Sequence, residues 1–271
     1  MNNSLVLAKD ENGKEIVYMG KGIGFKAKAG DELDESKIEK TFVLKDDTST
    51  KEYVRLIEKT PNEYIDIVNN IIDYAKEKYN FKLNDQIFIT LIDHICFAIE
   101  RYRSNIKIQN RLVWEVKKFY PKEFQTGVYA VDYINNKLSI DLPEEEAANI
   151  AFHIVNAQIE NGEMEDTMLT VKMLKDIFNI VQYNTGVKVN KDSISYSRFV
   201  THLQFFIQRL LEDKTINSKD SFILNQIKRE YPLQYKCATL IREYVNNLLD
   251  KSIGDEELLY LTIHIIRVIE R

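Results

Sequence analysis

The chain has 271 residues, of which 44% are hydrophobic and 29% charged, so it is long enough to bury a sizeable core. Only 9 glycines and 4 prolines occur, which argues against a disordered or loop-rich chain and favours long helices. The net charge of −5 gives no overall basic signature for nucleic-acid binding. The sequence has no secretory leader pattern, no apolar run of membrane-spanning length, and its two cysteines lie in separate apolar stretches. We therefore expect a cytoplasmic protein without membrane insertion.

The first 50 residues have the pattern of a small β-rich domain. Alternating apolar runs at residues 4–8 and 15–19 flank the turn signal Asp-Glu-Asn-Gly at residues 10–13, which predicts a hairpin. Between Lys14 and Lys28 there are four lysines and one glutamate. A local cationic strip beside an aromatic residue is typical of small sheets that bind single-stranded or bulged RNA. An ordinary turn-rich β domain is the alternative interpretation.

Beyond residue 51 the apolar residues recur with a helical period. A first helix is expected to start near Pro61, and others at about 83–101, 104–119, 122–136 and 143–160; a second set follows at about 168–184, 192–212, 219–230, 233–249 and 254–270. The pattern predicts a multidomain protein, with a small N-terminal antiparallel β domain followed by two homologous all-α five-helix domains. The predicted boundaries are 1–50 for the β domain, 51–60 for a linker, and 61–164 and 165–271 for the helical domains.

The chain contains four histidines, and they occupy matching positions of the two helical domains. One spacing aligns His153 with His264 and also aligns two Tyr-Pro pairs and two Tyr-x-Asn-Asn segments. Nearly the same spacing aligns His94 with His202. Each histidine lies where the apolar stripe of a predicted helix meets a polar edge, so we expect half-exposed side chains. A duplicated domain with a pair of reactive histidines in each copy is the hypothesis to test.

Several chemistries could use these histidines. A single helical histidine is more often a buried, hydrogen-bonded one, but four at matched positions weaken that interpretation. Metal binding is disfavoured because no predicted helix carries two histidines at ligand spacing. General acid–base catalysis is disfavoured because Asp93, which adjoins His94, does not share its helix face, and the second copy has Thr201 at that position. Phosphoryl acceptance by a neutral imidazole is favoured, with Arg198 and Arg267 on suitable faces to hold an anionic group beside His202 and His264.

Several segments carry a resemblance to a known family. The segment NGKEIVYMGKGIGFKAKAGDELDESKIEKTF resembles the co-antiterminator RNA-binding domain of the BglG/SacY family of transcriptional antiterminators. The motifs LIDHICFAIER, EEEAANIAFHIVNA, RFVTHLQFFIQRL and DEELLYLTIHIIRVIER resemble the two phosphotransferase-system (PTS) regulation domains of that family. The resemblance covers nearly the whole chain and rests on long motifs.

The resemblance implies a homodimer that binds an RNA hairpin in a leader transcript and thereby prevents termination of a sugar utilisation operon, most closely one for β-glucosides. The implied RNA-binding residues are Asn3, Ser4, Gly20, Lys21 and Phe25. The sugar-specific enzyme II permease is implied to phosphorylate the inhibitory sites His94 and His153, and the phosphocarrier HPr the activating sites His202 and His264. No cofactor, metal or enzymatic activity is implied.

One departure from the family pattern concerns the N-terminal strand. Family members usually begin with about six more residues, basic and apolar, before the Asn-rich tract that contains Asn3. Either the start lies further upstream, which we favour, or the β domain lacks an edge strand and binds RNA weakly. Two other functions stay open on the sequence. They are a DNA-binding activator built on the same regulation domains, disfavoured because residues 1–50 resemble strands, and an enzyme that transfers phosphoryl groups through its histidines.

Overall fold

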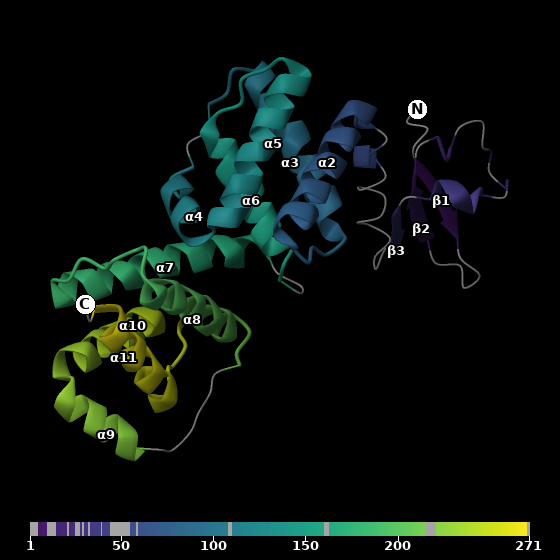
Figure 1. Cartoon of the computed structure of the whole chain (residues 1–271). Coiled ribbons are helices and arrows are strands. Elements are labelled where there is room, and N and C mark those ends of the chain that lie inside the picture. Colours follow the sequence, from purple (N-terminus) through teal and green to yellow (C-terminus); the bar gives the residue numbers. More distant parts are fainter. Residues whose placement is uncertain are drawn as a thin grey trace. The chain divides into compact units, whose positions relative to one another are not determined.

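The structure is a computed structural model of the whole chain (Figure 1). It describes residues 5–9, 15–20, 22–24, 28, 30–31, 33–38, 40–43, 55–57, 59–107, 110–159, 163–214 and 221–269. The chain divides into two compact units, Met1–Gly162 and Glu163–Arg271. In the described part of the chain, no helix is both long enough and apolar enough to cross a membrane.

The N-terminal segment contributes a three-stranded sheet of order β1-β2-β3. Strand β1 (Leu5–Lys9) pairs antiparallel with β2 (Glu15–Met19), which pairs antiparallel with β3 (Lys40–Val43). Val17 and Met19 alternate along β2 and are both buried, as expected for side chains on one face of a strand. Much of 1–50 lies outside the described residues, so the separate antiparallel β domain stays a prediction.

Unit 1 also contains a group of helices, and its two histidines lie in α3 and α6. The helices are α2 (Asn62–Tyr79), α3 (Gln86–Arg103), α4 (Val113–Phe119), α5 (Pro121–Leu138) and α6 (Glu144–Asn156). Helix α3 packs against α2 and α6, and α5 packs against α2, α4 and α6. Their inward faces are apolar at helical spacing, so burial of these stripes drives the packing.

Gly127 allows α5 to approach α6 very closely. A Cβ atom at this position would lie 2.0 Å from the backbone oxygen of Ala147, a distance at which no side chain fits. Ala147 follows directly after Glu146, so the close approach also sets where the first turn of α6 lies. Glycine is therefore required here for packing rather than for an unusual backbone conformation.

Unit 2 repeats this order of helices. It consists of α7 (Met164–Thr185), α8 (Ile194–Leu211), α9 (Ser221–Glu230), α10 (Pro232–Leu249) and α11 (Asp255–Ile269). Helix α8 packs against α7 and α11, and α10 packs against α7, α9 and α11. Figure 1 shows unit 2 in green to yellow, with α9 joined to α8 by a segment outside the described residues.

The duplication is visible in the ends of the corresponding helices α5 and α10. Each begins with proline, Pro121 or Pro232, whose fixed φ suits the first helical position. Each ends at a non-glycine residue in the left-handed region, Ser139 with φ 53° and Asp250 with φ 54°. The repeat predicted from the sequence therefore extends to the backbone conformation at both helix termini.

One predicted helix is shorter than expected. The sequence pattern predicted a helix over residues 104–119, but α4 begins only at Val113. Asn105 adopts a left-handed conformation with φ 54°, which turns the chain directly after α3. The side chain of Asn110 then accepts a hydrogen bond from the backbone N–H of Leu112, at 2.8 Å. Such a local turn competes with the helix for backbone groups, and the apolar pattern alone does not reveal it.

Candidate functional site

The first site lies between α3 and α6 and contains both histidines of unit 1. His94 comes from α3 and His153 from α6, and their ring centroids are 4.9 Å apart. Both side chains are half-buried, as predicted for residues at the edge of an apolar stripe. The packing of α3 against α6 therefore joins two histidines that are far apart in the sequence.

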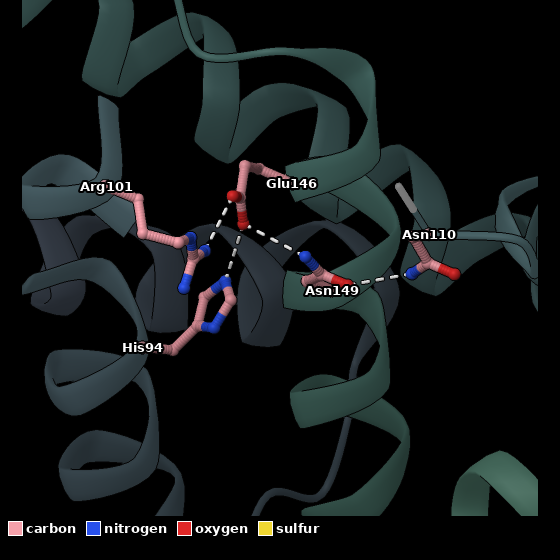
Figure 2. Close-up of polar contacts among 5 residues, drawn as sticks. All are labelled: His94, Arg101, Asn110, Glu146 and Asn149. Atoms are coloured by element: carbon pink, nitrogen blue, oxygen red, sulfur yellow. Dashed lines mark hydrogen bonds and ion pairs between the residues drawn. The ribbon is translucent and has the colours of Figure 1, made fainter. Parts of the chain in front are cut away.

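The buried carboxylate of Glu146 links the histidine pair to α3 and to the loop before α4. The side chain of Glu146 is only 3% exposed, and its Oε2 lies 3.0 Å from Nε2 of His94 (Figure 2). Its Oε1 accepts a hydrogen bond of 2.8 Å from Arg101. Asn149 donates to Oε2 at 3.1 Å and accepts a bond of 2.7 Å from Asn110. Every oxygen of this buried carboxylate thus has a partner, as a buried charge requires.

These contacts determine the charge state of the carboxylate. Burial on its own would raise the pKa of Glu146, but the hydrogen bonds from His94, Asn149 and Arg101 outweigh burial and lower the pKa to about 2. Glu146 also lies in the first turn of α6, where the helix dipole favours a negative charge. The carboxylate is therefore ionised at neutral pH and acts as a hydrogen-bond acceptor.

His153 has a different environment from His94. Burial, with a smaller effect of the neighbouring His94, lowers its pKa to about 3. Its Nδ1 is buried and has no hydrogen-bond partner among the described residues. The ring is therefore neutral at physiological pH and keeps a lone pair on one of its nitrogens.

The second site lies between α8 and α11 of unit 2. The rings of His202 and His264 stack with centroids 4.0 Å apart and an interplanar angle of 19°. Phe199 lies 6.2 Å from His264 and Tyr260 6.1 Å from His202, measured between ring centroids. Both histidines are half-buried. Stacking of this kind favours neutral rings, because two imidazolium ions at this distance would repel each other.

A carboxylate–guanidinium pair also lies in the second site, but with a different bonding pattern. The side chain of Glu257 is 1% exposed. Arg209 donates to it through Nε at 3.0 Å and through Nη2 at 2.8 and 2.9 Å. This bidentate contact involves both carboxylate oxygens of Glu257. No hydrogen bond between His202 and Glu257 occurs among the described residues, and Nε2 of His202 is buried without a partner there.

Burial and neighbouring cations keep the second pair neutral. Burial first, then His264 and Arg209, lower the pKa of His202 to about 4. Burial and the nearby Arg267 lower the pKa of His264. The site therefore presents two uncharged imidazoles next to two fixed positive charges.

The arginines predicted to support an anion are placed unequally. Arg267 is exposed and close enough to His264 to lower its pKa. Arg198 is also exposed, but it forms no hydrogen bond or ion pair within the described ranges. The cation that acts on His202 is instead Arg209. Of the predicted RNA-binding residues, Gly20 is described and buried, whereas Asn3, Ser4, Lys21 and Phe25 lie outside the described residues.

Sequence reasoning missed the buried glutamates and their arginine partners. In each unit the arginine follows the first histidine by two helical turns, and the glutamate precedes the second histidine by two helical turns. A charged residue at such spacing lies on the same helix face as the histidine. This repeated pattern of charge on a largely apolar face was the signal that could have revealed Arg101, Glu146, Arg209 and Glu257.

The arrangement defines a class of protein. Each unit presents two adjacent imidazoles, half-buried between two helices and close to a buried carboxylate–guanidinium pair. Neutral imidazole is a nucleophile that can accept a phosphoryl group, and the acquired charge would change the local packing energy. Within the described residues no group of three or more histidine, cysteine or acidic side chains could hold a metal ion. The class is that of duplicated helical domains that carry paired histidines.

Comparison with known proteins gives the family. The PRD domain family matches residues 69–157 and again 175–268, and the CAT RNA binding domain family matches residues 1–51. The transcription antiterminator LicT of Bacillus subtilis (strain 168) is 41% identical over 271 residues, which cover 100% of this chain and 98% of that protein. The beta-glucoside operon antiterminator of Dickeya chrysanthemi is 41% identical over 268 residues, 99% of this chain and 94% of that protein.

A solved structure agrees with these matches. The crystal structure of GlcT CAT-PRDI has a TM-score of 0.50 and 34% sequence identity, and it covers 59% of this chain and 95% of that chain. The chain belongs to the family of transcription antiterminators that join a CAT RNA-binding domain to two PRD domains. The family predicted from the sequence motifs is thereby confirmed.

Proposed function

We propose that the protein is a transcription antiterminator that binds an RNA hairpin in a leader transcript and is controlled by histidine phosphorylation from the phosphotransferase system. Relatives that match nearly the whole chain carry the name antiterminator, which supports the RNA-binding half of the proposal. The matches to two PRD domains support the regulatory half. In this role the protein acts as a cytoplasmic regulator rather than an enzyme.

One observation carries the regulatory proposal. In both units, two helices bring together two half-buried histidines, with ring centroids 4.9 Å and 4.0 Å apart. A phosphoryl group on such a ring adds about −1.5 to −2 charges at a packed helix interface. A change of that size in a partly buried place shifts a packing equilibrium and can serve as a switch.

We assign opposite signals to the two units. His94 and His153 accept phosphoryl groups from the sugar-specific enzyme II permease, and their phosphorylation inhibits the protein. His202 and His264 accept them from the phosphocarrier HPr, and their phosphorylation activates it. The positive charge of Arg267 beside the second pair supports this difference, because it favours an added anion. Arg198 is a second candidate for the same role.

The proposed RNA-binding part of the protein is the N-terminal domain, which acts as a homodimer. Its boundaries are proposed as residues 1–50, with a linker over 51–60 and PRD domains over 61–164 and 165–271. Asn3, Ser4, Gly20, Lys21 and Phe25 are the proposed RNA contacts, and a β-glucoside operon is the proposed target. The printed name of the Dickeya relative supports that choice of target.

The test combines phosphorylation with RNA binding. The full chain is incubated with phosphorylated HPr and then titrated into a leader RNA hairpin in a gel shift, alongside duplex DNA of the same sequence. We expect phosphate on His202 and His264, detected by mass spectrometry, and tighter binding to RNA only. The chain holds four histidines, so a variant with all four replaced by alanine is a matched control that accepts no phosphate. Phosphorylation without any change in RNA binding, or preferential binding to DNA, would contradict the proposal.

A further inference from the structure

The hydrogen bond between His94 and Glu146 decides which nitrogen of His94 carries the proton. Nε2 lies 3.0 Å from Oε2 of Glu146, and the carboxylate is an acceptor only, because it is ionised. Nε2 must therefore be the donor. In a neutral imidazole only one nitrogen carries hydrogen, so the lone pair lies on Nδ1.

The opposite nitrogen is free of competing contacts. Within the described residues no group donates to or accepts from Nδ1 of His94, and this atom is not among the buried polar atoms that lack a partner. The side chain keeps 14% of its surface exposed. Figure 2 shows the second ring nitrogen on the side of the ring away from Glu146. Nδ1 is thus both basic and open to an incoming group.

Other hydrogen bonds hold the Glu146 carboxylate in place beside His94. Arg101 and Asn149 hold the two carboxylate oxygens from other directions, and Asn110 holds Asn149 in turn (Figure 2). A carboxylate held at three points cannot rotate away from His94 without breaking several charge-assisted hydrogen bonds. The orientation of the imidazole follows from this fixed acceptor.

Unit 2 shows that the contact is not an automatic result of the fold. The corresponding Glu257 accepts hydrogen bonds from Nε and Nη2 of Arg209, and no hydrogen bond joins Glu257 to His202 among the described residues. The same pair of residue types therefore orients the histidine in unit 1 and leaves it unoriented in unit 2. The difference restricts the effect to His94.

We propose that Glu146 is a positioning residue that fixes the Nε2–H tautomer of His94 and thereby makes Nδ1 the nitrogen that accepts a phosphoryl group. This inference rests on the proposed function, in which His94 is a phosphoryl acceptor. The donor is the phosphorylated enzyme II of the proposed function. The lone pair of Nδ1 attacks the phosphorus, the bond between the phosphorus and the donor atom breaks, and its electron pair stays on the donor atom.

The proton balance favours this route. The hydrogen on Nε2 stays in place throughout, so the ring becomes a phosphorylated imidazolium whose positive charge faces the Glu146 carboxylate. A hydrogen bond from a charged donor to a carboxylate is stronger than the neutral one that preceded it. Attack through Nε2 would instead require loss of that bond and burial of the carboxylate without His94.

The tautomer can be measured before any phosphorylation. In the full chain with His153, His202 and His264 replaced by glutamine, His94 is the sole histidine, so its ¹⁵N signals need no assignment. Long-range ¹H–¹⁵N NMR at about pH 8, well above the ordinary histidine pKa, is expected to show Nε2 as the protonated nitrogen in at least about tenfold excess, which corresponds to ~1.4 kcal/mol of hydrogen-bond preference. The unsubstituted chain provides the check that the three substitutions do not disturb the site. A predominantly Nδ1–H tautomer would overturn the inference.

The second step identifies the phosphorylated nitrogen. The same chain is treated with phosphoramidate, and the isomer is read from ³¹P and long-range ¹⁵N spectra. We expect phosphate on Nδ1, and a loss of at least about tenfold in its rate for Glu146→Gln, whose amide donates to Nε2 and shifts the proton to Nδ1. Glu257→Gln is the matched control and should leave the His94 product unchanged.

The outcomes separate the inference from the proposed function. Phosphate on Nε2 of His94 would overturn the positioning role of Glu146 and leave His94 as an acceptor. If phosphorylated HPr and enzyme II, and phosphoramidate, all leave His94 unmodified in the otherwise unsubstituted chain while the other histidines react, the acceptor role of His94 fails and the inference fails with it. If Glu146→Gln unfolds unit 1, the tautomer of the Glu146-containing chain still decides the question.

Discussion

The two helical units carry the same charged residues at corresponding places and connect them differently. In unit 1 the buried carboxylate of Glu146 is shared among His94, Arg101 and Asn149, and Nε of Arg101 is left without a partner among the described residues. In unit 2 Arg209 uses its Nε as well and takes both oxygens of Glu257. A duplicated scaffold therefore supports two hydrogen-bond patterns, and only one of them orients a histidine.

The helix spacing differs between the units in a related way. Gly127 lets α5 approach α6 closely, whereas the corresponding residue of unit 2 is the fully buried Ala238. Helices α10 and α11 accordingly pack less closely than α5 and α6. Ala147, whose backbone faces Gly127, directly follows Glu146 in the chain. The two units therefore differ in helix packing as well as in the hydrogen bonds of the buried glutamate.

The largest expected effect comes from removing the arginine in unit 2. Arg209→Ala would leave the buried Glu257 carboxylate without its partner, and we expect a loss of about 4 kcal/mol in the free energy of unfolding of that unit. The matched change Arg101→Ala should cost about half as much, because Glu146 keeps His94 and Asn149. Urea unfolding followed by circular dichroism and by hydrogen exchange in α6 and α11 measures both. Equal costs would mean that the two bonding patterns are energetically equivalent.

Gly127→Ala tests the spacing of α5 and α6. The added methyl group would meet the backbone oxygen of Ala147, so we expect a loss of about 3 kcal/mol in unit 1. Trp114 is the sole tryptophan and lies in α4, so its fluorescence reports unfolding of unit 1. The reverse change Ala238→Gly in unit 2 should cost only about 1 kcal/mol, the difference in helix propensity. A tolerated Gly127→Ala would show that the helices can separate without cost.

The free energy of unfolding is expected to depend on pH through His202. His202 has a pKa of about 4 in the folded protein and about 6.5 when unfolded, so unfolding takes up a proton between these values. Its stabilising effect is complete above about pH 6.5 and is lost as the pH falls to about 4. Because the ring is half-exposed, we expect a loss on the order of 1–2 kcal/mol, which His202→Gln should remove. Unfolding of both chains by urea across this range measures the difference; identical pH profiles would contradict the low pKa.

The smallest effect is expected at the residue that connects Glu146 to the loop before α4. Asn149→Ala removes one hydrogen bond to Glu146 and one from Asn110, and we expect a cost of about 1 kcal/mol in unit 1. The corresponding Tyr260 in unit 2 is 43% exposed, so Tyr260→Ala should cost less than about 0.5 kcal/mol. Thermal unfolding compares the pair, and a larger effect at Tyr260 would reverse the contrast between the units.

Much of the fold could be predicted from local patterns. The helical period, the two Tyr-Pro pairs and the matched histidines predicted both the duplication and the order of helices. These signals can be recognised along the sequence without knowledge of which segments pack together. The prediction was wrong at residues 104–107 and 110–112, where the left-handed Asn105 and the turn at Asn110 interrupt the helical pattern. Those side-chain turns compete with helix formation in a way that apolar spacing does not register.

The sequence by itself determined the family, the duplication and the four histidines at helix edges, since each follows from motifs or periodicity along one segment. The tertiary structure decided which histidines meet, and that the buried Glu146 forms a hydrogen bond to one of them. Helices α4 and α5 lie between α3 and α6 in the chain, so the approach of His94 to Glu146 depends on long-range packing. The different use of Arg101 and Arg209 also depends on tertiary packing, because the same residue types at the same spacing form different hydrogen bonds in the two units.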